Sequence, residues 1–180
     1  TVVERDAALV ELAREHLALP DTPRLRVVVG EGRAEVARMP AGGADLLVID
    51  AFVGVLVPHH LVTAGFAEDA RRLLRPGGLH VVNLIDIPPL GLAAGAAAAL
   101  ACAYPHVALL AEDPVLHHRS AGNVVLAASD APLPLEELRR EAGRESSPWR
   151  VRSGRALERM LAGAPPLMDG IPPQHELARL

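Results

Sequence analysis

The chain has 180 residues, half of them hydrophobic, and a formal net charge of -4 from 18 basic and 22 acidic side chains. This length is enough for one domain with a full core. A weakly acidic chain offers no basic surface to a phosphate backbone, so we expect no nucleic-acid partner, and the lack of a polybasic run predicts no membrane contact from this chain. The single cysteine, Cys102, excludes an internal disulfide, indicates a cytoplasmic location and is predicted to be a small buried side chain.

The first 130 residues alternate short apolar runs with amphipathic segments. In chain order, the pattern predicts a strand over residues 1–4, a helix over 7–17, a strand over 25–29, a helix over 34–39 and a strand over 44–50. It continues with a helix over 63–74, a tight turn at 75–78, a strand over 79–84, a helix over 90–103, and strands over 107–111 and 123–128. Strands that are apolar on both faces and separated by helices indicate a parallel sheet, whose edge the last two strands form as an antiparallel pair.

The composition changes at Pro132, beyond which only short helices over residues 135–142 and 154–161 and a proline-rich tail are predicted. Trp149 is expected to be a tucked-in aromatic of this tail. We therefore expect residues 1–130 to form a Rossmann-like domain, and residues 131–180 to form an extension of helix and loop packed on it. The predicted class is α/β, with a mostly parallel sheet and an antiparallel edge.

Acidic residues follow three of the predicted strands. Glu4 closes the first strand, and Asp50 ends the third. Glu31 follows the second, between Gly30 and Gly32. Because the carboxyl ends of parallel strands share one edge, we expect these acids to line a common crevice, where an acid can accept both hydroxyls of a ribose and glycines let a flat base approach the backbone. Asp50 can hold or deprotonate a cationic group, and the alternative for each acid is a helix N-cap or a solvated turn.

Several segments, taken in their order and spacing, resemble the spermidine synthase-like proteins. They are residues 1–17 (TVVERDAALVELAREHL), 27–33 (VVVGEGR), 45–58 (DLLVIDAFVGVLVP), 73–83 (LLRPGGLHVVN), 123–129 (NVVLAAS) and 164–169 (APPLMD). The resemblance implies the fold of S-adenosylmethionine-dependent methyltransferases. It also implies polyamine biosynthesis, by transfer of an aminopropyl group from decarboxylated S-adenosylmethionine to a small-molecule amine, and it allows a homodimer.

The resemblance assigns roles to the residues at the strand ends. It implies that Glu4 binds the cofactor ribose, and that Glu31, where the family usually has aspartate, lies near the adenine amine. It places Asp50 opposite the substrate amine, as the catalytic residue. The cofactor-binding set implied in this way is Glu4, Gly30, Glu31, Gly32, Asp50 and Ala51.

The chain departs from the family's pattern in two ways. Residues 53–56 are Val, Gly, Val and Leu, where the family usually carries a second acid after the position of Asp50. The family's first strand and its glycine-rich loop are absent from this chain, and each buried backbone group left without a partner would cost about 1–3 kcal/mol. Either another segment or chain fills that place, or the strands pair directly, or the sequence is a fragment, which is the interpretation we favour.

Two other functions stay open. The missing second acid favours methyl transfer from S-adenosylmethionine to an unknown acceptor, and the two departures together allow a catalytically degenerate domain with a structural or regulatory role. No metal is expected, because the adjacent histidines at residues 59–60 and 117–118 point apart and rarely supply two ligands to one ion. Tyr104 is predicted to pack near a helix end.

Overall fold

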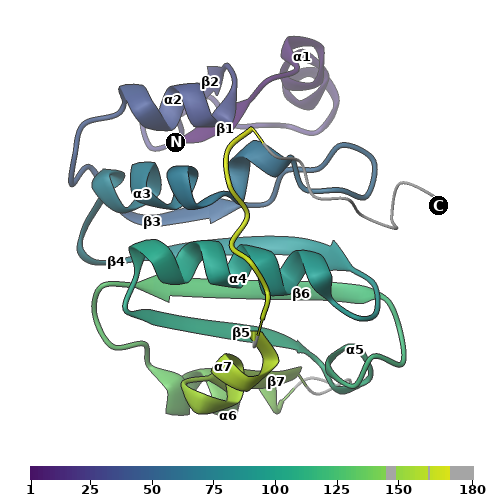
Figure 1. Ribbon diagram of the computed structural model, residues 1–180. Helices are drawn as coiled ribbons and strands as arrows, with labels where there is room; N and C mark the ends of the chain where they lie inside the picture. The colour runs from purple at the N-terminus through teal and green to yellow at the C-terminus, as the bar shows by residue number, and fades with distance from the viewer. Residues whose placement is uncertain (145–148, 162, 171–180) are drawn as a thin grey trace. The chain divides into compact units, whose positions relative to one another are not determined.

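The computed structural model describes residues 1–144, 149–161 and 163–170 (Figure 1). The chain divides into two compact units, an N-terminal unit (Thr1–Pro40) and a C-terminal unit (Ala41–Leu180). The domain boundary predicted after residue 130 falls inside the C-terminal unit, and a division there stays a prediction.

In the N-terminal unit, two short parallel strands are connected through a helix. β1 (Val2–Glu4) pairs in parallel with β2 (Val27–Val29). α1 (Ala7–His16) begins after Asp6, whose carboxylate accepts two backbone N–H groups of the first turn, and α2 (Gly32–Arg38) follows β2. These predicted elements are confirmed, with ends that differ by at most two residues.

The C-terminal unit is built on a mixed sheet. Its strands are β3 (Ala44–Ile49), β4 (Leu74–Asp86), β5 (His106–Glu112), β6 (Gly122–Ser129) and β7 (Trp149–Ser153). They lie in the order β3-β4-β6-β5-β7, with β3 and β4 parallel, β6 antiparallel to both of its neighbours and β7 antiparallel to β5. The α/β class and the antiparallel pairing of β5 with β6 are therefore confirmed.

Two helices, α3 (Ala64–Leu73) and α4 (Gly91–Ala103), cover one face of this sheet (Figure 1). The core lies between them and the sheet, where Phe66, Val82 and Leu84 are almost completely buried. The shorter helices among the described residues are η1 (His59–Leu61), α5 (Asp113–Leu116), α6 (Leu135–Ala142) and α7 (Arg155–Leu161).

A histidine lies in this core. His80 of β4 is 1% exposed, and its ring packs edge-on against Phe66 and Tyr104, with ring centres 6.0 and 5.7 Å away. Within the described part of the chain, neither His80 nitrogen has a hydrogen-bond partner, and nor does the Tyr104 hydroxyl. Burial lowers the pKa of His80 to about 4 and raises the pKa of Tyr104. The predicted packing role of Tyr104 at the end of α4 is confirmed.

The tight turn predicted at residues 75–78 lies inside β4 rather than before it. Leu74 and Leu79 pair with Ala44 and Leu46 of β3, so the residues between them loop out of the ladder. One of the two glycines in this segment has a φ of 77°, and a side chain on the other would lie 2.9 Å from a backbone oxygen. The glycines are therefore required by the local geometry, although pairing continues on both sides of them.

Two further expectations are wrong. Residues 149–153, predicted as part of a tail, form the edge strand β7, in which Trp149 and Val151 alternate with arginines, a period typical of a half-exposed strand. Cys102 is exposed instead of buried, because it lies on the solvent side of α4, where its thiol is 3.4 Å from the carbonyl oxygen of Ala98.

Residues 163–170, yellow in Figure 1, cross α4 and contact the start of α3. The Ala64 N–H donates to the Leu167 carbonyl at 2.8 Å, and the Leu167 N–H donates to the Gly95 carbonyl at 3.2 Å. A side chain on Gly95 would lie 2.9 Å from Leu167, so a small residue is needed at this crossing. The segment is therefore bound to both helices.

Thr63→Val is expected to lower the free energy of unfolding by about 1–2 kcal/mol. The buried Thr63 hydroxyl accepts the Phe66 N–H at 3.2 Å, which caps α3, and donates to the Asp169 carboxylate at 2.6 Å. Valine keeps the shape of the side chain and loses both bonds. Urea denaturation measures the difference, and Thr63→Ser, which keeps the hydroxyl, is the control. Equal stability of the valine variant and the wild type would contradict this assignment.

Candidate functional site

Asp50 is the first residue after β3, at the carboxyl end of the parallel β3–β4 pair. Its carboxylate is exposed, and Oδ1 accepts a hydrogen bond from Nδ2 of Asn83 at 2.8 Å. Oδ2 forms no hydrogen bond or ion pair with any described residue. One oxygen is thus fixed by the neighbouring strand, while the other can accept a proton or bind a cation.

Asn83 continues this contact across the sheet. Its Oδ1 accepts a hydrogen bond from Nδ2 of Asn123 at 3.3 Å. Hydrogen bonds therefore connect Asp50, just after β3, with Asn83 of β4 and Asn123 of β6. A carboxylate only accepts hydrogen bonds, so the amide of Asn83 must turn its NH₂ group toward Asp50. Neither asparagine was predicted as a site residue from the sequence, where the available signal is a single amide inside the apolar run of β4.

Asp86 is the nearest acid along the neighbouring strand, but it has a structural role. It ends β4, is 2% exposed, and accepts the backbone N–H groups of Ile87 and Ala93, both at 2.8 Å. These bonds attach the first turn of α4 to the end of β4. Both carboxylate oxygens are therefore already engaged within the protein.

The loop after Asp50 presents an apolar turn. Val53 and Leu56 are joined by two backbone hydrogen bonds of 2.8 and 3.2 Å, with Gly54 at a φ of 64°. The Val53 and Val55 side chains remain 54% and 49% exposed. This turn is thus a defined structure that exposes hydrophobic side chains three and five residues after the candidate catalytic carboxylate.

The N-terminal unit brings its own predicted site residues together. Glu4 lies opposite the last residue of β2, and the Gly30 N–H donates to the Glu4 carbonyl at 3.0 Å. The Glu4 carboxylate accepts the Asp6 N–H through Oε1 at 2.8 Å, whereas Oε2 forms no hydrogen bond with the described residues. Glu31 caps α2, because its oxygens accept the N–H groups of the next turn at 3.2 and 2.9 Å.

Glu4, Gly30, Glu31 and Gly32 therefore lie at the carboxyl end of one parallel strand pair, and Asp50 and Ala51 lie at the carboxyl end of another. The first four belong to the N-terminal unit and the last two to the C-terminal unit. A single crevice lined by all of them stays a prediction. Glu31 has the N-cap geometry that the sequence analysis named as the alternative to ligand binding.

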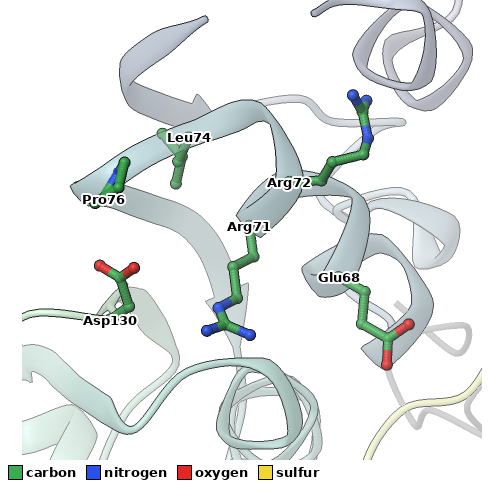
Figure 2. A pocket seen from close by; sticks show the side chains of 6 residues that line it. All are labelled: Glu68, Arg71, Arg72, Leu74, Pro76 and Asp130. Carbon is green, nitrogen blue, oxygen red and sulfur yellow. The ribbon is translucent and has the colours of Figure 1, made fainter. Parts of the chain in front are cut away.

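A pocket of about 390 Å³ opens elsewhere on the C-terminal unit (Figure 2). It is lined by residues of α3, of the start of β4 and of the segment after β6, namely Glu68, Arg71, Arg72, Leu74, Pro76 and Asp130. Because β3 and β4 are parallel, this pocket lies at the amino end of the strands, opposite to Asp50. It contains none of the site residues predicted from the sequence.

One histidine of each adjacent pair contacts a backbone carbonyl of the protein. His59 donates from Nε2 to the Met168 carbonyl at 3.0 Å, and His117 lies with Nδ1 2.8 Å from the Asp113 carbonyl oxygen. Among the described residues, no cluster of three or more His, Cys, Asp or Glu side chains could hold a metal ion. In the same part of the chain, no helix has the length and apolar character needed to cross a membrane.

Comparison with known proteins finds aminopropyltransferases and spermidine synthases among the sequences similar to this chain. No protein-family model matches the chain. A polyamine aminopropyltransferase of Vibrio vulnificus (strain CMCP6) is 30% identical over 91 residues, which are 49% of this chain and 30% of that protein. Spermidine synthase 1 of Hyoscyamus niger is 32% identical over 84 residues, 43% of this chain and 26% of that protein.

A solved structure matches far more of the chain. It is that of a probable spermidine synthase from Corynebacterium glutamicum ATCC 13032, with a TM-score of 0.86 and 29% identity over 97% of this chain and 64% of that one. The chain is thus similar to spermidine synthases in both sequence and structure. It spans about a third or less of the length of the curated relatives it matches.

More distant structures share the fold of this chain. A spermidine synthase in complex with the transition-state analogue AdoDATO matches 79% of the chain with a TM-score of 0.61 and 21% identity. Human methyltransferase-like protein 13, in complex with SAH, matches 98% of the chain with a TM-score of 0.60 and 23% identity. The predicted methyltransferase-type fold is therefore confirmed.

Proposed function

We propose that this chain is part of an enzyme that transfers an aminopropyl group from decarboxylated S-adenosylmethionine to an amine. The nitrogen of the acceptor attacks the carbon next to the sulfonium of the donor. The carbon–sulfur bond breaks, and its electron pair stays on sulfur as a neutral thioether. Because a sulfonium leaves readily, the protein mainly has to align the two substrates and remove one proton from the acceptor ammonium.

The observation that carries this proposal is that only one of the two Asp50 carboxylate oxygens is hydrogen-bonded to a described residue. Asn83 holds one of its oxygens at the carboxyl end of β3, and the other oxygen is available to an incoming ammonium. An acid in this position can bind the cationic acceptor and then accept its proton. The relationship to spermidine synthases supports an amine as the acceptor.

The acidic side chains of the N-terminal unit can accept hydrogen bonds from an adenosine-containing donor. The available Oε2 of Glu4 can accept a ribose hydroxyl, as a strand-end acid does in dinucleotide-binding folds. Glu31, whose carboxylate caps α2, is proposed to lie near the adenine amine. We propose Gly30 and Gly32 as the backbone that lies beside the same molecule.

Calorimetric titration of the full-length protein tests donor binding. The three ligands are S-adenosylmethionine, its decarboxylated form and 5′-methylthioadenosine. Tight binding of the decarboxylated form and of the thioether product, with weak binding of S-adenosylmethionine, is the expected result. Heat from none of the three would exclude the enzyme and favour the degenerate domain with a structural or regulatory role.

Glu4→Ala is expected to weaken donor binding by about 1–3 kcal/mol, which is about 5- to 150-fold in Kd. The change removes a charged acceptor of ribose hydrogen bonds and the bond that Oε1 accepts from the Asp6 N–H, while the pairing of β1 with β2 is made by the backbone. Glu11→Ala, on the exposed surface of α1, is the matched control and should bind as the wild type does. An unaltered Kd for Glu4→Ala would show that the ribose assignment is wrong.

Methyl transfer from S-adenosylmethionine is the second candidate. The observation that favours it is the apolar turn at Val53 and Val55, which provides no second carboxylate for a polyamine. Mass spectrometry of the acceptor after reaction distinguishes an added methyl group from an added aminopropyl group. Preferential binding of S-adenosylmethionine in the titration would point to the same alternative.

A further inference from the structure

We propose that the acceptor is an amine with one cationic nitrogen and an apolar substituent, and that this substituent lies against the turn formed by Val53 and Val55. The inference rests on the proposed aminopropyl transfer and narrows its acceptor. It follows from the charges and the hydrophobic surface that the C-terminal unit presents around Asp50.

The first step concerns the number of available carboxylates. Asp50 has one free oxygen, and residues 51–62 of the following loop contain no acid. Asp86, at the end of the adjacent strand, is buried and bonded to two backbone N–H groups, so it cannot leave to bind a ligand without exposing those donors. Among the acids that end β3 and β4 or belong to the loop after β3, Asp50 is therefore the one with a carboxylate oxygen available to an ammonium.

The second step concerns the surface beside that partner. Val53 is three residues from Asp50, so its backbone lies within about 10 Å of the carboxylate-bearing residue. Its side chain and that of Val55 are about half exposed, while the neighbouring Val57 is 5% exposed. The two backbone hydrogen bonds between Val53 and Leu56 fix the conformation of the turn that carries this hydrophobic surface.

The third step compares two kinds of acceptor of equal length. A diamine held at Asp50 would bring its second ammonium onto valine side chains, where it loses hydration and gains no counter-charge. A monoamine with an alkyl chain would instead remove apolar surface from water on both sides. Each additional methylene that is buried in this way should improve kcat/KM by about fourfold.

The experiment uses the full-length protein and decarboxylated S-adenosylmethionine, with a series of n-alkylamines and with 1,4-diaminobutane and 1,5-diaminopentane. We expect kcat/KM to rise from propylamine to hexylamine, and to be at least tenfold higher for pentylamine than for the diamine of comparable length. A preference for the diamine would overturn the inference and leave aminopropyl transfer intact. Transfer to none of these amines, despite donor binding, would overturn the proposed function itself.

A pair of variants tests whether the turn with Val53 causes the preference for monoamines over diamines. Val53→Asp adds a carboxylate, and Val53→Asn is the matched neutral control of the same size. We expect the ratio of kcat/KM for 1,4-diaminobutane over butylamine to be at least tenfold higher in Val53→Asp than in Val53→Asn. The exposed position of Val53 makes both changes compatible with folding. Equal ratios in the two variants would show that the turn does not contact the acceptor.

Discussion

Asp50→Asn should lower kcat by about 10²- to 10⁴-fold, the usual contribution of a positioned general base. Asparagine has the same size as aspartate, and its carbonyl oxygen can still accept the hydrogen bond that Asn83 donates. The change therefore removes the ability to take a proton while it keeps the local structure. The Kd of the donor should stay close to that of the wild type, since the residues proposed to bind it are mostly others.

Initial rates with saturating donor and acceptor measure this effect, and calorimetry gives the donor Kd. Asp45→Asn is the control, because Asp45 belongs to the same strand and forms an exposed ion pair with Arg75 at 2.8 Å. Such a pair contributes little, so this variant should be as active as the wild type. Turnover of Asp50→Asn at the wild-type level would remove Asp50 from the mechanism.

The protein should lose as much as about 3 kcal/mol of stability through His80 as the pH falls from 6.5 to 4. Burial lowers the pKa of His80 to about 4 from a usual value of 6.5, so the unfolded chain binds a proton in a range where the folded protein does not. This contribution to stability is complete above pH 6.5 and is lost progressively as the pH falls toward 4. His80→Leu should abolish it.

Urea unfolding of wild type and His80→Leu at pH 7, 5.5 and 4 isolates this contribution, because all other titrating groups are common to both proteins. At pH 7 the leucine variant should be more stable by about 1–3 kcal/mol, since two buried nitrogens without partners are removed. His16→Gln on the surface is the control and should follow the wild-type pH dependence. Parallel pH profiles for wild type and His80→Leu would contradict the burial argument.

The sequence was sufficient for those features that depend on local chemistry. Asp6 is a helix N-cap, and the glycines of residues 75–78 mark a change in the backbone, because both effects arise within a few residues. Asp50 was placed at a strand end by the apolar run that precedes it. These interpretations needed no knowledge of the tertiary structure.

Features that depend on distant partners could not be predicted in the same way. The contact between Asp50 and Asn83 is set by the β3–β4 register, and the residues that loop out of β4 shift that register. β7 exists because β5 offers it a free edge. The side of α4 that carries Cys102 could not be chosen either, because the helix is apolar almost all round and has no polar stripe to mark the solvent side.

Residues 163–170 are bonded to residues that directly follow the loop with the apolar turn. His59 and Thr63, which follow that loop, are bonded to Met168 and Asp169. A protein that ends before Met168 would leave the side chains of His59 and Thr63, at the end of the loop after Asp50, without these partners. Reduced turnover in a shortened protein would therefore report a displaced loop, and would not show that the removed residues touch a substrate.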